Sequence, residues 1–141
     1  PNHGCIETMC SGTSLGRDLR AFAEAHPGSA LAEVHAGGRL DSRSGLALAL
    51  EGDLGAREVF TAAGRWLGVA VASLTNIFDP DVVVIGGGLS AAGDLLLAPA
   101  REEYLSRALP PTRRAPLLLA HFRQDAGMVG AGILAAEGGP A

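Results

Sequence analysis

The sequence contains no lysine, because all 11 of its basic residues are arginine. This absence excludes mechanisms that need a side-chain amine, such as a Schiff base or the lysine of a phosphate-binding P-loop. The arginines are scattered, with no basic run longer than Arg113-Arg114, and the formal net charge is −4. We therefore expect no nucleic-acid-binding surface within these residues.

Cysteines and long apolar runs are also scarce. The two cysteines, Cys5 and Cys10, are too few and too close together to form a disulfide framework. No apolar run approaches the roughly 20 residues of a membrane span. The amino-terminal residues show no signal-peptide pattern. These absences predict a cytoplasmic protein with no membrane partner.

Apolar residues as a class, by contrast, are plentiful. Hydrophobic residues make up 48% of the 141 positions and charged residues 18%. This composition is typical of a folded domain with a buried core and not of a disordered chain. The length fits one domain of ordinary size.

Apolar residues recur every three or four positions through most of the chain, which predicts helices. One helix is expected over residues 8–28, ending at His26-Pro27-Gly28. The longest covers residues 53–79, where Gly64 and Gly68 predict close packing against another element. Further helices are expected over residues 29–38, 41–52, 89–109 and 124–141.

Residue types at the helix ends predict further details. Asp41-Ser42 is expected to cap the helix that follows it, because short polar side chains accept hydrogen bonds from free backbone amides. Gln124 or Asp125 is expected to cap the last helix in the same way. Pro99 falls inside a helical pattern and predicts a kink or a break there.

Two segments have the composition of buried strands. Residues 82–85 are Val-Val-Val-Ile without polar alternation, which is typical of a parallel strand buried on both faces. Residues 115–122 predict a second short buried strand. The order of helices, strand, helix, strand and helix indicates an α/β arrangement with a right-handed crossover. Since a stable sheet normally has more than two strands, we expect further chain before Pro1.

The run Gly86-Gly87-Gly88 follows the first predicted strand, and two interpretations remain open. Ligands of open α/β sheets bind beyond the carboxyl ends of strands, where glycines let the backbone approach a ligand closely. A tight strand-to-helix turn without a ligand explains the same residues. The G-x-G-x-x-G pattern is not matched, because the next glycine is Gly93. The sequence is therefore compatible with nucleotide contact but not with NAD.

The stretch Gly4-Cys5-Ile6-Glu7 is the second candidate site. A structural zinc site needs four ligands, and Cys5 with His3 falls short of that number. From these residues alone, Cys5 is interpreted as a buried thiol and Glu7 as a carboxylate that stabilises a helix amino terminus. His121, after the second strand, is likewise interpreted as structural.

Three motifs together resemble the ROK family of bacterial sugar kinases and related transcriptional repressors. "PNHGCIETMCSG" is similar to the end of that family's C-x-C-G-x-x-G-C-x-E signature. "NIFDPDVVVIGGGLS" resembles its second signature, and "AHFRQDAGMVGAGILAAE" its closing strand and helix. The resemblance implies an α/β fold, helix-rich with a partial sheet. Residues 1–141 would be the carboxyl-terminal, second lobe of an actin-like (ribonuclease H-like) two-lobed ATPase.

The resemblance also implies roles near the amino terminus. Residues 1–8 would be the end of the zinc- and sugar-binding motif, with Cys5 a ligand of a structural zinc. Glu7 would accept hydrogen bonds from the sugar hydroxyls. The family's other zinc ligands have no counterparts here, and His3 occupies a variable position. This chain alone is therefore not expected to hold zinc.

The family's turn against the adenosine of ATP corresponds to Gly86, Gly87 and Gly88. No catalytic residue is expected in this chain. The family's phosphate-binding D-x-G-G-T segment and its general-base Asp have no counterparts here. Both are expected in an amino-terminal lobe before residue 1, which would act on ATP with Mg²⁺.

Together these roles imply the carboxyl-terminal portion of an ATP-dependent, glucokinase-type kinase that phosphorylates a hexose and is inactive as this chain alone. The alternative within the family is the sugar-sensing domain of a transcriptional repressor, which would keep the same residues. A self-standing nucleotide-binding or scaffold module is the third hypothesis. The resemblance also implies a homo-oligomer.

Overall fold

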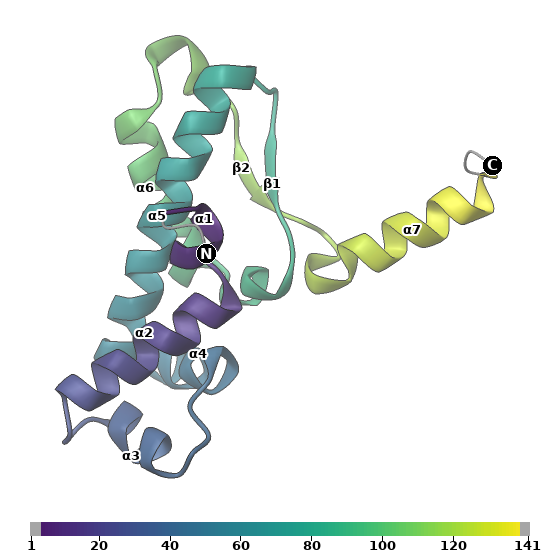
Figure 1. Ribbon diagram of the computed structural model, residues 1–141. Helices are drawn as coiled ribbons and strands as arrows, with labels where there is room; N and C mark the ends of the chain where they lie inside the picture. The colour runs from purple at the N-terminus through teal and green to yellow at the C-terminus, as the bar shows by residue number, and fades with distance from the viewer. Residues whose placement is uncertain (1–3, 139–141) are drawn as a thin grey trace.

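The computed structural model describes residues 4–138, which form a helical body with a small sheet at one side and a projecting last helix (Figure 1). In chain order the elements are α1 (Ile6–Met9), α2 (Gly12–Ala25), α3 (Ala30–Ala36), α4 (Ser42–Glu51), α5 (Leu54–Phe78), β1 (Val83–Ile85), the 3₁₀ turn η1 (Gly88–Ala92), α6 (Asp94–Arg107), η2 (Pro110–Thr112), β2 (Leu117–Leu119), η3 (Arg123–Asp125) and α7 (Ala126–Ala136). No helix in this part of the chain is long and apolar enough to cross a membrane.

The cap predicted at Asp41 is confirmed. Its carboxylate accepts hydrogen bonds from the backbone amides of Arg43, at 2.9 Å, and Ser44, at 2.8 Å. Helix α4 then ends at Gly52, whose φ of +107° is a left-handed conformation that favours glycine. The first half of the body is therefore divided into short helices by local polar and glycine signals.

The prediction of one helix over residues 8–28 is wrong, because the chain forms two helices there. Helix α1 ends at Cys10, and Ser11 caps α2 by accepting a hydrogen bond from the backbone amide of Ser14. The Ser14 hydroxyl in turn accepts one from the Ser11 amide, at 2.8 Å. This reciprocal cap satisfies backbone amides that an unbroken helix would satisfy internally. It therefore favours the start of a new helix after Ser11.

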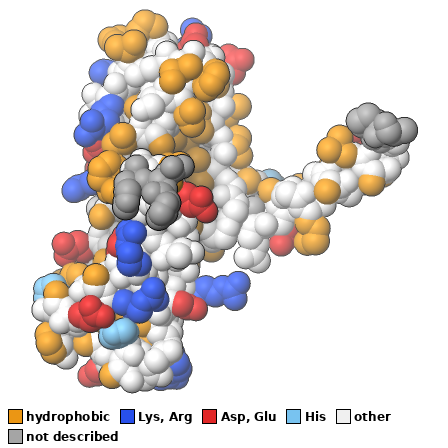
Figure 2. Space-filling model, in the orientation of Figure 1, with side chains coloured by type: hydrophobic (Ala, Val, Ile, Leu, Met, Phe, Trp, Pro, Cys, Tyr) orange, Lys and Arg blue, Asp and Glu red, His pale blue; other side chains and the backbone are white. Residues whose placement is uncertain are grey.

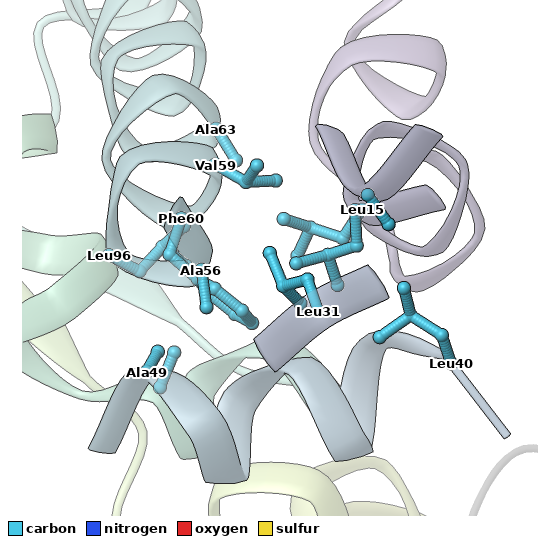
Figure 3. Close-up of a cluster of buried hydrophobic side chains, with 12 residues drawn as sticks. Leu15, Leu31, Leu40, Ala49, Ala56, Val59, Phe60, Ala63 and Leu96 are labelled. Carbon is cyan, nitrogen blue, oxygen red and sulfur yellow. The ribbon is translucent and has the colours of Figure 1, made fainter. Parts of the chain in front are cut away.

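The larger hydrophobic core joins α2, α3, α4 and α5 (Figure 3). Leu15 and Leu31 point from their helices toward Val59 and Phe60 of α5, and all four side chains are buried. Leu96 of α6 closes the same cluster. This core fixes α4 and α5 beside the start of α6, where the glycine turn lies.

The close packing predicted for Gly64 and Gly68 is confirmed. Both glycines face α6, and a Cβ on Gly64 would lie 2.5 Å from the carbonyl oxygen of Leu96. A Cβ on Gly68 would collide with the carbonyl oxygen of Ala100. The two helices can therefore approach each other only because these side chains are missing.

The kink or break predicted at Pro99 is not observed, since α6 runs from Asp94 to Arg107 with Pro99 inside it. The proline ring lies against Gly64, where a Cβ would come within 2.6 Å of Pro99 Cγ. The missing side chain on α5 thus leaves room for the ring. Packing against α5 holds the helix through a residue that disfavours it.

Strands β1 and β2 pair in parallel, with Val84 opposite Leu118. The helices α5 and α6 cover one face of this sheet and form a second core with it. Its buried residues include Leu97, Tyr104 and Leu117, and Val83 packs against them. The prediction of strands buried on both faces is wrong, because Val84 is 53% and Leu118 47% exposed. Nothing within residues 4–138 covers that second face.

The predicted last helix forms as α7, and it extends away from the body (Figure 1). It is rich in small and apolar residues, none of them buried, and Met128 is 72% exposed. The cap predicted at Gln124 or Asp125 is not formed: Asp125 precedes the helix, but no side-chain cap hydrogen bond is present. Figure 2 shows the resulting hydrophobic side chains along this arm.

Candidate functional site

The turn after β1 leaves its backbone open. Gly87 has φ +84°, a conformation that favours glycine, and Gly86, Gly87 and Gly88 are all exposed. A Cβ built on Gly87 or Gly88 would meet no atom within 4 Å. The turn therefore has room for a ligand directly against its main chain.

Ser90 stabilises this turn through two hydrogen bonds to Gly87. Its hydroxyl donates a hydrogen bond to the carbonyl oxygen of Gly87 at 2.6 Å, and its backbone amide donates to the same oxygen at 3.1 Å. Ser90 is 0% exposed. The sequence analysis missed this residue, although a hydroxyl three positions after a turn residue is a recognisable signal of such a bond.

A pocket of about 480 Å³ opens on one side of the glycine turn. Phe60 and Leu46 contribute apolar surface, and the side chains of Arg43 and Gln124 contribute polar groups. The full lining is Gly12, Ser42, Arg43, Leu46, Phe60, Gly88, Leu89, Ala91, Ala92 and Gln124. A largely apolar cavity with a few polar groups has the character of a small-molecule site.

A second pocket of about 360 Å³ opens between the glycine turn and the start of α2. Cys10 and Ser11 line it from one side, and Gly86 and Gly88 from the other. Gly88 lines both pockets. The structure thus brings the glycine turn next to the segment that directly follows α1.

Glu7 lies in the first turn of α1 and is exposed, as a helix-terminal carboxylate would be. The guanidinium of Arg17 donates a hydrogen bond to the carbonyl oxygen of Thr8 at 3.1 Å, which ties α1 to α2. Glu7 is not among the residues that line either pocket. Its carboxylate therefore stands on the element next to the second pocket and not inside it.

The two cysteines differ from each other in exposure. The interpretation of Cys5 as a buried thiol is wrong: it is exposed, immediately before α1. Cys10 is half-buried, and burial raises the pKa of its thiol. A raised pKa keeps the proton on sulfur, which disfavours Cys10 as a metal ligand.

No group of three or more His, Cys, Asp or Glu side chains gathers as a metal site among residues 4–138. His3 lies outside the described residues. His121 is exposed, and its ring meets the ring of Phe122 edge-on at 4.9 Å between centroids. It lines neither of the two pockets at the glycine turn.

The pocket residues Arg43 and Gln124 also escaped the sequence analysis. They lie 81 positions apart, since 124 − 43 = 81, and only the fold brings them to one cavity. Neither belongs to a local motif. No signal within a single sequence identifies such a pair.

The family model described as "ROK family" matches residues 1–138. The glucokinase of Halalkalibacterium halodurans is 35% identical over 133 residues, which are 93% of this chain and 40% of that protein. The DNA-binding transcriptional repressor Mlc of Escherichia coli is 32% identical over 109 residues, which are 77% of this chain and 26% of the repressor.

Among solved structures, a ROK family glucokinase from Streptomyces griseus in complex with glucose and AMPPNP is similar, with a TM-score of 0.85 and 32% identity. The likeness covers 97% of this chain and 46% of that one. The chain thus spans less than half the length of the glucokinases it matches.

Proposed function

Because this chain belongs to the ROK family, we propose that it forms the carboxyl-terminal lobe of a two-lobed, ATP-dependent hexose kinase of the glucokinase type. The observation that carries the proposal is the pocket of about 480 Å³ at the glycine turn. Its place beyond the carboxyl end of β1 is the place where α/β sheets bind ligands. The glucokinase with bound AMPPNP and glucose supports the same assignment.

In this proposal the adenosine of ATP occupies the larger pocket. Gly88, which lines this pocket, leaves the ring and ribose room against the main chain, since no atom lies within 4 Å of the position its Cβ would take. Phe60 and Leu46 supply apolar surface, and the side chains of Arg43 and Gln124 supply polar groups at the pocket. A mostly apolar cavity with a few polar groups can bind the flat adenine base without an ion pair.

The sugar is assigned to the side of the turn where the second pocket opens. Glu7 accepts hydrogen bonds from its hydroxyls in this proposal, and a charged acceptor makes such bonds strong and directional. The exposure of Glu7 leaves the carboxylate accessible to a ligand held between this lobe and another. Holding the sugar and ATP on opposite sides of one turn brings the two substrates together.

The groups that move protons and bind phosphate are assigned to the rest of the protein. A general-base Asp there would take the proton from the attacking sugar hydroxyl, and Mg²⁺ would offset charge on the phosphates. A structural zinc would take Cys5 as one ligand of four, but the described residues do not complete such a site. No step in this proposal depends on zinc.

A sugar-sensing domain of a transcriptional repressor is the second candidate. The similarity to the repressor Mlc over 77% of this chain favours it. A sensor needs the sugar site but no phosphoryl transfer. The two candidates therefore differ in turnover and not in sugar binding.

A coupled assay on the full-length protein with glucose, ATP and Mg²⁺ tests the proposal. Turnover that depends on both substrates is the expected result. Sugar binding by calorimetry without turnover, together with DNA binding, would support the repressor instead. Absence of both sugar and nucleotide binding would contradict the two candidates alike.

A further inference from the structure

A pocket of about 290 Å³ lies between the second half of α6 and the segment that leads into β2, and we name it the α6–β2 pocket. These elements are at the end of the body opposite α3 (Figure 1). None of the described residues that line it belongs to either pocket at the glycine turn. A ligand held there would therefore be separate from the ligands assigned to that turn.

The charged side chains around the α6–β2 pocket are all basic. Arg101, Arg113 and Arg114 line it, and no Asp or Glu among the described residues does. The whole chain has a formal net charge of −4, so three guanidinium groups at one pocket oppose the overall charge. A pocket lined by one sign of charge attracts ligands of the opposite sign. Charge complementarity therefore favours an anion as the occupant.

The guanidinium of Arg113 is oriented by the chain and has no anionic partner in it. Its Nε donates a hydrogen bond to the carbonyl oxygen of Ala108, at the end of α6, at 2.7 Å. No carboxylate within residues 4–138 forms an ion pair with it. With Nε engaged, the two terminal nitrogens remain as a fork. Such a fork matches two oxygens of a carboxylate or of a phosphate.

The other two arginines of the pocket have acidic partners. Nη1 of Arg101 lies 3.4 Å from the carboxylate of Asp94, and Nη2 of Arg114 lies 2.7 Å from that of Asp79. These two aspartates offset the charges of Arg101 and Arg114. The charge of Arg113 is the one left over, so a ligand with a single anionic group balances the pocket.

The rest of the pocket surface is largely apolar. Tyr104 and Leu117 belong to the second core and are buried. The Tyr104 hydroxyl donates a hydrogen bond to the carbonyl oxygen of Thr112 at 2.8 Å, so its polar group is satisfied within the chain. Leu105 is 49% and Leu118 47% exposed. A ligand that covers these two leucines removes apolar surface from water, which favours binding.

From these observations we propose that the α6–β2 pocket binds a small organic anion with one carboxylate or phosphate group and an apolar body. The anionic group pairs with the fork of Arg113, and the body covers Leu105 and Leu118. A volume of about 290 Å³ is at the small end of the range of ligand pockets and suits a body of about one aromatic ring. The proposal does not depend on the proposed kinase activity, because it uses different residues.

Calorimetric titration of the full-length protein with benzoate and with phenyl phosphate tests the proposal. At least one of the two is expected to bind, and the tighter of them identifies the anionic group. Benzyl alcohol carries a ring without a charge, and it should bind about tenfold more weakly or not at all. Failure of both anions to bind, or equal binding of benzyl alcohol, would overturn the proposal.

Two variants test whether the anion occupies the α6–β2 pocket. Arg113→Gln removes the fork and should weaken anion binding about tenfold or more. Leu105→Glu adds a carboxylate at an exposed pocket position and should weaken binding by like-charge repulsion, while the bond from Arg113 to Ala108 remains. Arg39→Gln is the matched control, because it removes an exposed guanidinium that does not line the pocket.

Circular dichroism of each variant checks that the fold is retained. Anion binding that is unchanged in folded Arg113→Gln and Leu105→Glu would overturn the proposal. So would loss of binding in Arg43→Gln alone, since that result would place the anion in the larger pocket at the glycine turn.

Discussion

The hydroxyl oxygen of Ser90 lies 2.6 Å from the carbonyl oxygen of Gly87, to which it donates a hydrogen bond. This bond holds the turn at the larger pocket. Ser90→Ala removes the hydroxyl donor and leaves the Gly87 carbonyl with one hydrogen bond fewer, at a cost of about 1 kcal/mol. We expect the KM for ATP to rise about fivefold and the KM for glucose to stay unchanged. Equal increases in both values would contradict this role.

The two adjacent glycines of the turn should respond differently to alanine. Gly87→Ala places a side chain at φ +84° and should lower the free energy of unfolding by about 1–2 kcal/mol. Gly88→Ala meets no neighbouring atom and has no positive φ, so stability should hardly change. Gly88→Ala should weaken ATP binding, because its methyl group enters the pocket assigned to adenosine, whereas Gly87 does not line that pocket. Calorimetry showing normal ATP affinity for Gly88→Ala would contradict that assignment.

The contact of Gly68 with α6 predicts a large loss of stability on substitution. Gly68→Ala forces a methyl group against the carbonyl oxygen of Ala100 and should cost about 1–3 kcal/mol. Gly130→Ala in α7 is the matched control, since no atom lies within 4 Å of its Cβ position. Chemical denaturation of the full-length protein measures both. Equal effects of the two substitutions would show that close helix packing is not what Gly68 provides.

Glu7→Ala in the full-length protein should weaken sugar binding by about tenfold or more, because hydrogen bonds to a charged group contribute about 1.5–3 kcal/mol each. ATP affinity should change little, since Glu7 does not line the larger pocket. Calorimetric titration with each ligand separates the two effects. The control is Glu24→Ala, which removes an exposed carboxylate near the end of α2. Equal losses for both ligands would count against Glu7 as the sugar acceptor.

The 141-residue chain alone should show no turnover in the coupled assay with glucose, ATP and Mg²⁺. The reason is that the general base and the phosphate-binding segment are assigned to the rest of the protein. The full-length protein assayed in parallel is the control. Measurable phosphorylation by the 141-residue chain would require a catalytic base within these residues. It would contradict the assignment of the general base to the rest of the protein.

Features that depend on neighbouring residues could be predicted from the sequence. The cap at Asp41 and the close packing at Gly64 and Gly68 are confirmed, because each follows from local chemistry. The family resemblance is also confirmed by the match over residues 1–138. The break at Ser11 was missed although its signal is local, because apolar periodicity continues across it.

Features that depend on distant segments could not be predicted in the same way. The apolar run at residues 82–85 indicates what a strand prefers to contact, but burial of its second face requires an element to cover it. Pro99 stays inside α6 because Gly64, 35 positions earlier (99 − 64 = 35), leaves room for its ring. The pocket residues Arg43 and Gln124 meet only through the fold.

Gly88 and Leu89 both line the larger and the second pocket, so the two pockets share part of one wall. A displacement of this wall that enlarges one cavity reduces the other. A ligand that displaces this wall from one side changes the affinity of the other side, and thermodynamic linkage requires the influence to be equal in both directions. Two ligands that share a wall of this kind sense each other through it without direct contact.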